Sequence, residues 1–373
     1  VIAARLPAVR RIPPILRRVR PDVILFDSWS GKLADSPKAI SDELRRRDAP
    51  FRQVWVLNDP AKAPDACEVV RPGSLAHLEY LGRAGHIVSN NTQRGHFRKK
   101  RATTYLQTWH GTPLKRIAFD VQGPWFAGSE RYLVDLRREV ATWDFLLSPN
   151  RFSTEVFRHA FRYEGRILET GYPRNDLLSC AERDSIRSSV RRELEVPDGA
   201  RVVLYAPTWR DDSSFSTELD IGSAADALGD QFVLLLRAHK QVADTVSMGR
   251  HPRVRNVSDR DDIGELLLAA DVLVTDYSSV MFDFAVTGKP MLFFTYDLAR
   301  YRDELRGFYF DFVSEAPGPL IETQAELVEA LSEADEIRAR FAGAYDRFRG
   351  RFCHLDDGHA AERVVDEVFF GSP

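Results

Sequence analysis

DVLVTDYSSVMFDFAVTGKPMLFFTY, residues 271–296, decides the fold class of this chain. An apolar run is followed by a tight polar turn, then by a helical stretch from about Ser278 to Gly288, and then by a second apolar run. Two buried strands joined through a helix are typical of a parallel sheet that is covered on both faces. The stretch therefore predicts an α/β fold built on parallel sheets.

The same alternation extends outward from this unit in both directions. Further strand-like runs lie at 23–26, 54–57, 86–89, 104–107, 145–148, 201–207 and 232–239, and helical patterns lie at 37–47, 74–83 and 129–140. A polar helical stretch at 179–194 joins two such halves. We expect two Rossmann-like domains, residues 21–178 and residues 179–373, with a helical run at 325–352 long enough to reach back across the boundary.

Composition narrows the class of protein. Of the 373 residues 44% are hydrophobic and 29% charged, which is typical of a soluble globular chain, and the net charge is only −3. An attraction for a polyanion must therefore come from local patches. Three separated cysteines with no CxxC pair favour neither a zinc knuckle nor a disulfide framework, and they indicate a reducing, cytoplasmic setting. The first residue is Val1, which indicates a chain cut from a longer protein.

The first segment, residues 1–20, contains six arginines and no acidic residue, with apolar residues at roughly helical spacing before Pro13 and Pro14. Such a basic amphipathic segment can lie on an anionic membrane surface. The alternative is a linker or a packed helix with its arginines in water. No stretch of the chain approaches the ~20 apolar residues that span a bilayer.

Polar residues gather directly after several predicted strands, where ligands of open α/β sheets bind. WHGTPLKR, residues 109–116, follows one strand and places His110 in a turn, where an imidazole with a reference pKa of about 6.5 can act as a base. Backbone carbonyls in a tight turn are the alternative partners of this histidine. The neighbours that we expect to bind substrate are Gly111, Thr112, Lys115 and Arg116.

The second half supplies candidate phosphate ligands. In RAHK, residues 237–240, Arg237 and His239 point to one side of a strand end, which suits a phosphate as well as it suits a solvated terminus. The helix start after 271–277 predicts an anion site, although serine is also a common plain N-cap. The candidate ligands in this half and at its border are Arg174, Asn175, Thr208, Arg210, Arg237, Thr275, Asp276, Ser278, Ser279 and Asp283.

One loop is strongly basic, and several cofactor motifs are missing. RGHFRKKR, residues 94–101, suits an anionic acceptor or an ordinary solvated loop, and it has too few aromatic residues to indicate nucleic acid. Neither a GxxxxGK[ST] loop, nor GxGxxG after a strand, nor HExxH occurs, and we do not interpret the acidic turn at 259–262 as a metal site. The sequence predicts neither a metal nor a cofactor.

Taken together, these clusters resemble the CDP-glycerol glycerophosphotransferase family, the teichoic acid primases and polymerases. The motifs that carry the resemblance run in order from about residue 22: FDSWSGKLADSPKAI, TWHGTPLKR, GYPRND, LYAPTWRDD, LRAHK, TDYSSVMFDFAVTGKPMLFF, YRDELRGFYFDF and CHLDDGHAAERVV. The resemblance implies a two-domain GT-B fold with an acceptor side at the N-terminus and a CDP-alcohol side at the C-terminus. It implies His110 as base, His239 as a second essential histidine, and Ser278 and Ser279 on the pyrophosphate; Lys240 stands where the family often has proline.

The expected activity is transfer of glycerol phosphate, or a related alditol phosphate, from CDP-glycerol or CDP-ribitol to a hydroxyl of a teichoic-acid-like or capsule polymer or its lipid-linked primer, with release of CMP. We expect the enzyme in the cytoplasm, at the inner face of the cell membrane. Two alternatives remain at this point: a nucleotide-sugar glycosyltransferase on the same fold, and a polymer-binding module without catalysis.

Overall fold

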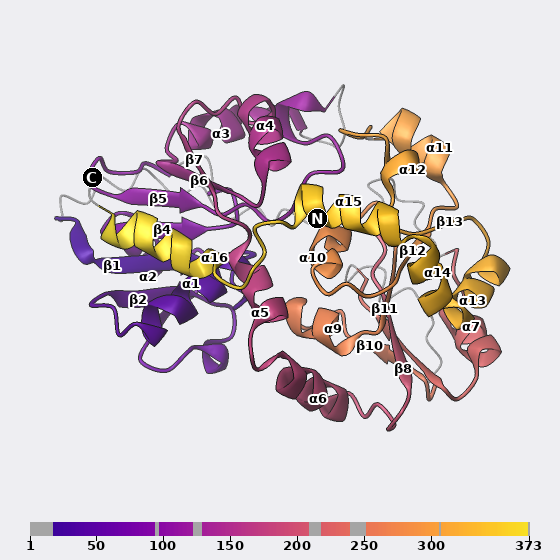
Figure 1. The fold of residues 1–373 in the computed structure, drawn as a ribbon. Coiled ribbons are helices and arrows are strands. Elements are labelled where there is room, and N and C mark those ends of the chain that lie inside the picture. The colour runs from indigo at the N-terminus through magenta and orange to yellow at the C-terminus, as the bar shows by residue number, and fades with distance from the viewer. Residues whose placement is uncertain are drawn as a thin grey trace.

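The computed structural model describes residues 18–93, 97–121, 129–208, 218–238, 251–305 and 307–371. Two separate sheets lie side by side with helices around them (Figure 1). Within the described residues, the strands of both sheets pair in parallel. The prediction of an α/β fold with two parallel sheets is confirmed.

The first sheet has seven strands in the order β3-β2-β1-β4-β5-β6-β7. Their bounds are β1 Arg20–Asp27, β2 Arg52–Val56, β3 Glu68–Val70, β4 Ala84–Ser89, β5 Thr104–Gln107, β6 Phe145–Ser148 and β7 Arg166–Glu169. The second sheet has six strands in the order β10-β9-β8-β11-β12-β13. Their bounds are β8 Arg201–Tyr205, β9 Phe232–Leu236, β10 Val254–Asn256, β11 Val272–Thr275, β12 Met291–Phe294 and β13 Leu320–Ile321.

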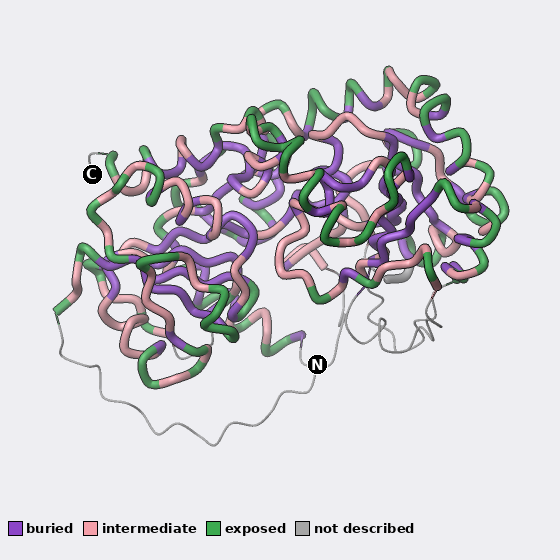
Figure 2. The backbone as a smooth tube through the Cα atoms, turned by 90° about the horizontal axis from the view of Figure 1, so that it is seen from below, coloured by how far each residue is buried: buried purple, intermediate pink, exposed green. Residues whose placement is uncertain are grey.

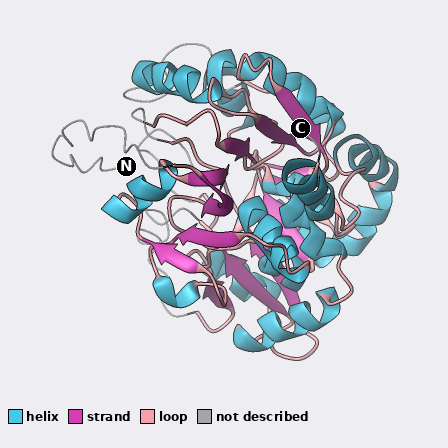
Figure 3. Ribbon diagram, turned by 90° about the vertical axis from the view of Figure 1, so that its left-hand side faces the viewer, coloured by secondary structure: helices cyan, strands magenta, loops and turns pink. Residues whose placement is uncertain are grey.

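Each sheet is covered by helices, so its strands are apolar on both faces. In β1, Val23 and Leu25 belong to one core cluster while Ile24 and Phe26 belong to another. This division follows from the two-residue period of a strand, and it explains why the strands appear in the sequence as continuous apolar runs. Most strand residues are buried. Figure 2 shows the buried residues gathered in the interior of each half, and Figure 3 shows strands with helices around them.

The helices of the first half are α1 Asp35–Arg46, α2 Leu75–Leu81, α3 Ser129–Val140, α4 Arg151–Ala160 and α5 Asp176–Ser179. Those of the second half are α6 Arg183–Glu193, α7 Ile221–Leu228, α9 Gly264–Ala269, α10 Val280–Ala285, α11 Leu298–Arg300, α12 Phe312–Glu315, α13 Gln324–Ser332, α14 Ala334–Arg340, α15 Ala342–Phe352 and α16 Ala360–Val365. Short 3-10 turns occur at Pro60–Lys62, Ala118–Asp120 and Pro173–Asn175, and π-helical turns at Tyr301–Leu305 and Asp366–Phe370.

The run at 325–352, which we expected to be one long helix, is three helices, α13, α14 and α15. The breaks fall at Glu333 and Phe341, which lie outside helical geometry. The apolar residues of the run serve two different cores: Leu327 and Leu331 pack in one cluster, whereas Phe352 packs in the other. One straight helix cannot point into both, so the chain bends between them.

After α15 the chain returns to the first half. Helix α16 packs against α1 (Figure 1). Val364 and Val365 are completely buried in the same cluster as residues of strand β1. The last described residues therefore complete the covering of the first sheet.

No helix in the described part of the chain is long and apolar enough to cross a membrane. Residues 1–17 of the basic segment expected at a membrane surface lie outside the described residues.

Candidate active site

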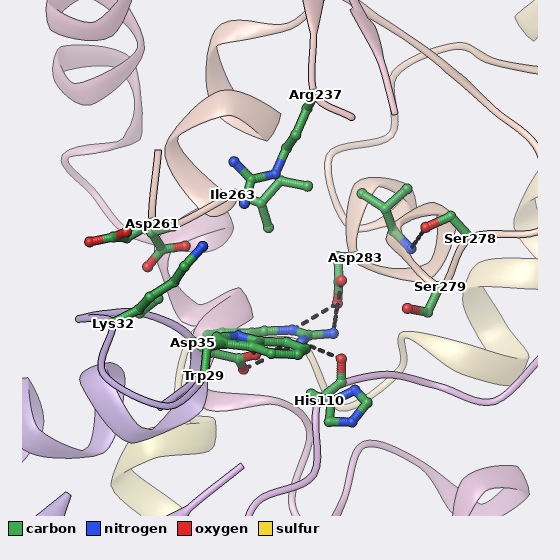
Figure 4. A pocket seen from close by; sticks show the side chains of 14 residues that line it. Trp29, Lys32, Asp35, His110, Arg237, Asp261, Ile263, Ser278, Ser279 and Asp283 are labelled. Carbon is green, nitrogen blue, oxygen red and sulfur yellow. Dashed lines mark hydrogen bonds and ion pairs between the residues drawn. The ribbon is translucent and has the colours of Figure 1, made fainter. Parts of the chain in front are cut away.

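A cavity of about 330 Å³ is lined by residues that follow the carboxyl ends of strands in both sheets. Figure 4 shows the side chains that line it. The loop after β1, the turn after β5, the end of β9 and the start of α10 all contribute to its wall. The residues that line it are Trp29, Lys32, Ala34, Asp35, His110, Arg174, Arg237, Asp261, Asp262, Ile263, Ser278, Ser279, Val280 and Asp283. The structure thus brings together six of the residues expected from the sequence: His110, Arg174, Arg237, Ser278, Ser279 and Asp283.

His110 is held between two tryptophans. Its ring stacks on Trp109 with 4.1 Å between centroids and lies 4.9 Å from Trp29. Trp109 has a φ of 51°, a left-handed conformation that is rare for a residue with a large side chain. The Trp109 N–H donates a hydrogen bond to Gln107 Oε1 (2.9 Å), which stabilises this turn. Burial among these groups lowers the pKa of His110 to about 4, an effect that Asp35 opposes and Arg174 reinforces. At neutral pH the imidazole is therefore uncharged and able to accept a proton.

Arg174 joins both walls of the cavity. Its guanidinium donates to both oxygens of Asp283 (3.0 and 2.9 Å from Nη2) and to both oxygens of Asp35 (3.3 and 3.2 Å from Nη1). Nη1 also donates to the His110 carbonyl at 2.8 Å. All three charged side chains are 10% exposed or less. Because its charge is already matched by two carboxylates, Arg174 positions His110 and connects the halves rather than offering a free charge to a ligand.

The two halves approach most closely at Gly111. A Cβ at Gly111 would lie 2.7 Å from Ser279 Oγ, which is closer than real contacts allow, so only glycine fits here. The Gly111 N–H donates to the hydroxyl of Tyr172 at 3.1 Å. The residue after His110 thereby fixes how near the histidine comes to the serines of the second half.

The wall of the second half carries the groups suited to an anion. Arg237 follows β9, and its Nη1 donates to the Arg260 carbonyl at 2.9 Å, which fixes the guanidinium at the cavity edge. Burial lowers the pKa of Arg237. Ser278 and Ser279 precede α10 and are both partly exposed to the cavity (Figure 4).

Other residues expected at the site lie behind it. Asp276 accepts the backbone N–H of Thr208 (2.9 Å) and of Tyr277 (2.6 Å), and Thr275 donates to the Ala206 carbonyl at 2.7 Å. These bonds connect the ends of β8 and β11. Thr112 is buried, and Asn175 donates to Asp356 at 3.3 Å.

Lys115 and Arg116 contact a different part of the second half. Lys115 forms a β-bridge with Phe308, and the Arg116 N–H donates to the Gly307 carbonyl at 3.1 Å. These contacts tie the loop after His110 to residues 307–309. Neither side chain lines the cavity.

Some residues expected at the site lie outside the described part of the chain. These are His239 and Arg210, together with Lys240 and residues 94–96 of the basic loop. Within that loop, Lys99 pairs with Asp144 at 2.6 Å and donates to the Thr103 carbonyl at 2.9 Å.

The loop after β1 was not expected to contribute to the site. Trp29, Lys32 and Asp35 line the cavity, and Trp29 and Asp35 have φ values of 49° and 63°. The available signal was their position directly after a buried strand, the same signal that identified His110. Asp261 was set aside as part of a polar turn; it lines the cavity and pairs with Lys62 of the first half at 2.5 Å. Among the described residues, no group of three or more His, Cys, Asp or Glu is arranged to hold a metal ion.

Comparison with known proteins identifies a family. Residues 11–370 match the model of the family described as CDP-glycerol:poly(glycerophosphate) glycerophosphotransferase. The chain is 37% identical over 383 residues to the teichoic acid poly(glycerol phosphate) polymerase of Bacillus subtilis, covering 99% of this chain and 50% of the relative. It is 38% identical over 363 residues to the teichoic acid glycerol-phosphate transferase of Staphylococcus aureus, covering 93% of each.

The chain thus spans about half the length of the polymerase from B. subtilis and of its counterpart from Staphylococcus epidermidis, of which it covers 51%. Relatives named for ribitol phosphate are less similar: a poly(ribitol-phosphate) polymerase of Bacillus spizizenii is 32% identical over 55% of this chain.

Solved structures of the same family have the same fold as this chain. The structure of the wall teichoic acid polymerase TagF matches with a TM-score of 0.88 at 37% identity, covering 94% of this chain and 89% of that one. A histidine-to-asparagine variant of TagF soaked with CDPG matches with a TM-score of 0.87. The UDP-GlcNAc 2-epimerase of Neisseria meningitidis shares the fold alone, with a TM-score of 0.58 at 11% identity. The expected GT-B arrangement is confirmed.

Proposed function

The chain belongs to the CDP-glycerol:poly(glycerophosphate) glycerophosphotransferase family, and on that premise we propose that it transfers glycerol phosphate from CDP-glycerol to a hydroxyl of a teichoic-acid-like polymer. One observation carries the proposal. An uncharged histidine from the first half and an arginine with two serines from the second half line one cavity at the meeting of the two sheets.

The proposed reaction is a displacement at phosphorus. The acceptor hydroxyl oxygen attacks the phosphorus that bears glycerol, a new P–O bond forms, and the P–O bond to CMP breaks. His110 takes the proton of the attacking hydroxyl, a role for which a neutral imidazole is suited. CMP leaves as a phosphate and needs little help from an acid.

We propose that residues of the second half stabilise the negative charge of the transferring phosphoryl group. Arg237 is held by the Arg260 carbonyl, and Ser278 and Ser279 line the same cavity. Donors that are in place before the reaction stabilise the charge that develops during it. By the family resemblance, His239 joins them at the donor phosphate. Arg174 acts indirectly, since its donors are occupied by Asp35, Asp283 and the His110 carbonyl.

Because the proposed base lies on the first half and the proposed phosphate donors lie on the second, each half is assigned one substrate. We propose that residues 21–178 hold the acceptor and residues 179–373 hold the CDP-alcohol. Glycerol is the proposed alcohol because four relatives named for glycerol phosphate are 37–38% identical over 93–99% of this chain. Two ribitol-phosphate polymerases are less similar, at 32% identity over 55% of the chain and 29% over 97%. The proposed place of work is the inner face of the cell membrane, with residues 1–20 and the basic loop at 94–101 as contacts for anionic surfaces or polymer.

Product analysis tests the proposal. The chain is incubated with CDP-glycerol, CDP-ribitol or nucleotide sugars and a short glycerol phosphate acceptor, and mass spectrometry follows both the acceptor and the released nucleotide. We expect growth of the acceptor by glycerol phosphate units with matching CMP release, and loss of both with His110→Ala. Release of a nucleoside diphosphate from a sugar donor would show a glycosyltransferase instead. Acceptor binding without release of any nucleotide would show a binding module.

A further inference from the structure

A second cavity, of about 430 Å³, lies entirely within the first half. It is enclosed by the 3-10 turn Ala118–Asp120, the end of α3, the loop before β6 and the chain that follows α4. Its lining residues are Phe119, Arg137, Val140, Ala141, Trp143, Phe161, Arg162, Tyr163, Glu164 and Gly165. We call it the α3–α4 cavity.

Two arginines converge on one aromatic ring at this cavity. The guanidinium carbon of Arg162 lies 4.7 Å from the centroid of Phe119, and that of Arg137 lies 5.6 Å from the same centroid. Within the described part of the chain, neither arginine forms an ion pair with a carboxylate. Two like charges gathered on one ring without a counter-charge favour an anion between or beside them.

The position of Arg162 is imposed by the backbone. Arg162 follows α4 and has a φ of 52°. Where a residue after a helix adopts this left-handed conformation, it is usually glycine. This turn directs the chain so that both Arg162 and Tyr163 line the cavity. A Cβ at Gly165 would lie within 2.5 Å of both Oη and Cζ of Tyr163. Glycine at this position therefore keeps this part of the wall open.

The rest of the wall is apolar. Val140, Trp143, Phe161 and Tyr163 are all buried members of one core cluster. Glu164 supplies a carboxylate, but it is exposed and makes no ion pair with either arginine in the described residues. A wall that combines aromatic faces with two guanidinium groups suits a ligand with both carbon and phosphate in each unit.

The α3–α4 cavity is also coupled to His110 through stacked rings. Phe161, which lines the cavity, packs edge-on against Trp109 with 4.6 Å between centroids, and Trp109 stacks on His110 at 4.1 Å. Only the Trp109 ring therefore stands between the imidazole and a wall residue of the second cavity. An acceptor whose terminal hydroxyl meets His110 carries its preceding phosphodiester groups within a few repeat units of this place.

We propose that the α3–α4 cavity binds a phosphodiester group of the growing acceptor polymer, through Arg137 and Arg162, with the glycerol carbons against the aromatic wall. This proposal rests on the proposed function, because it assumes a poly(glycerol phosphate) acceptor. It makes the cavity a length-sensing subsite: a long acceptor reaches it and a very short one does not.

The test measures binding of glycerol phosphate oligomers, from a dimer to a long chain, by calorimetry with no donor present. The variant is Arg137→Gln with Arg162→Gln. We expect its affinity for long oligomers to fall about tenfold or more, because hydrogen bonds to a charged phosphate are lost, while its affinity for the dimer stays unchanged. Arg137→Lys with Arg162→Lys should retain part of the affinity, since an ammonium still attracts phosphate.

A matched control removes the same charge from α3 and α4 at positions away from the cavity. Arg138→Gln with Arg151→Gln changes arginines that are 64% and 83% exposed, pair with Asp135 and Glu155, and do not line the cavity. This control should bind every oligomer within about twofold of the wild type, because exposed ion pairs contribute little. Circular dichroism and thermal unfolding confirm that each variant folds; Arg137 and Arg162 are exposed, so folding should be unaffected.

The outcomes separate this proposal from the proposed function. Equal weakening by the control and the variant, or no weakening by either, overturns the subsite. Co-sedimentation with phosphatidylglycerol vesicles provides a further comparison: loss of vesicle binding with oligomer affinity intact would assign the cavity to a lipid headgroup and overturn the polymer assignment. If the wild type binds long oligomers through the two arginines but releases no CMP from CDP-glycerol, the proposed function fails and the subsite stands.

Discussion

Replacing Arg174 by methionine should destabilise the protein strongly, because the arginine neutralises two buried carboxylates. Asp35 lies on the first half and Asp283 on the second, and their side chains are 5% and 6% exposed. Removing one partner of a buried ion pair costs about 3–5 kcal/mol, mainly because charge is left buried and uncompensated. That is a large part of the 5–15 kcal/mol by which proteins are typically stable. Turnover should fall as well, since the His110 carbonyl loses its donor.

The assay is urea unfolding of three proteins, together with the CMP-release rate of each. The wild type is compared with Arg174→Met and with a triple variant that adds Asp35→Asn and Asp283→Asn. If uncompensated charge is the cause, the triple variant should recover much of the lost stability but not the activity. A control, Arg253→Met, removes an arginine whose partners Asp226 and Asp230 are 72% and 97% exposed, and it should cost far less.

The pH dependence of Arg174→Met gives an independent check. Burial already raises the pKa of Asp283 while Arg174 opposes the rise, so removing Arg174 should raise this pKa further above its unfolded value of about 3.9. A folded state with the higher pKa binds more protons, so stability is gained as pH falls. The deficit of the variant should shrink from pH 7 towards pH 5. A deficit below about 1 kcal/mol, or equal stability of the single and triple variants, would refute the reasoning.

The other predictions concern the cavity itself. His110→Ala should lower turnover about 10²–10⁴-fold, and the acid limb of the wild-type kcat/KM profile should fall near pH 4 rather than 6.5, as stopped-flow CMP release can show. Because the folded pKa of His110 lies below the unfolded one, this group should also reduce the unfolding free energy as pH drops from about 6.5 to 4. Ser278→Ala with Ser279→Ala should weaken CDP binding in calorimetry by about 1.5–3 kcal/mol for each lost hydroxyl that donates to phosphate. Gly111→Ala should lower both thermal stability and turnover, because the added Cβ would lie too close to Ser279 Oγ. Adding Ser279→Gly should restore the stability, but CDP affinity should then be low because the Ser279 hydroxyl is missing.

The apolar runs predicted the central strands well because a strand buried on both faces has a continuous apolar sequence. The runs at 23–26 and 271–277 correspond to β1 and β11. The edge strands of both sheets, β3, β7, β10 and β13, were not predicted. They have two to four residues, and such short segments carry little apolar signal of their own.

At the site, the strand-end rule found His110 and Ser279 because each follows a buried strand directly. The same rule could not show that Arg174 is neutralised by two carboxylates, since Asp35 and Asp283 are far from it in sequence. Nor could it separate Asp276, which holds backbone N–H groups behind the cavity, from residues that line it. Those distinctions depend on which long-range partners each side chain meets.

The return of helix α16 to the first sheet has a consequence for biosynthesis. Domains generally fold in the order in which the ribosome makes them. Here Val364 and Val365 fill the core beside Ile24 and Phe26, so part of one apolar face of the first sheet, next to α1, stays uncovered until almost all of the described chain has been translated. The first half therefore cannot complete its core until the second has been made, and we expect a product that ends before α16 to expose this apolar surface and to aggregate.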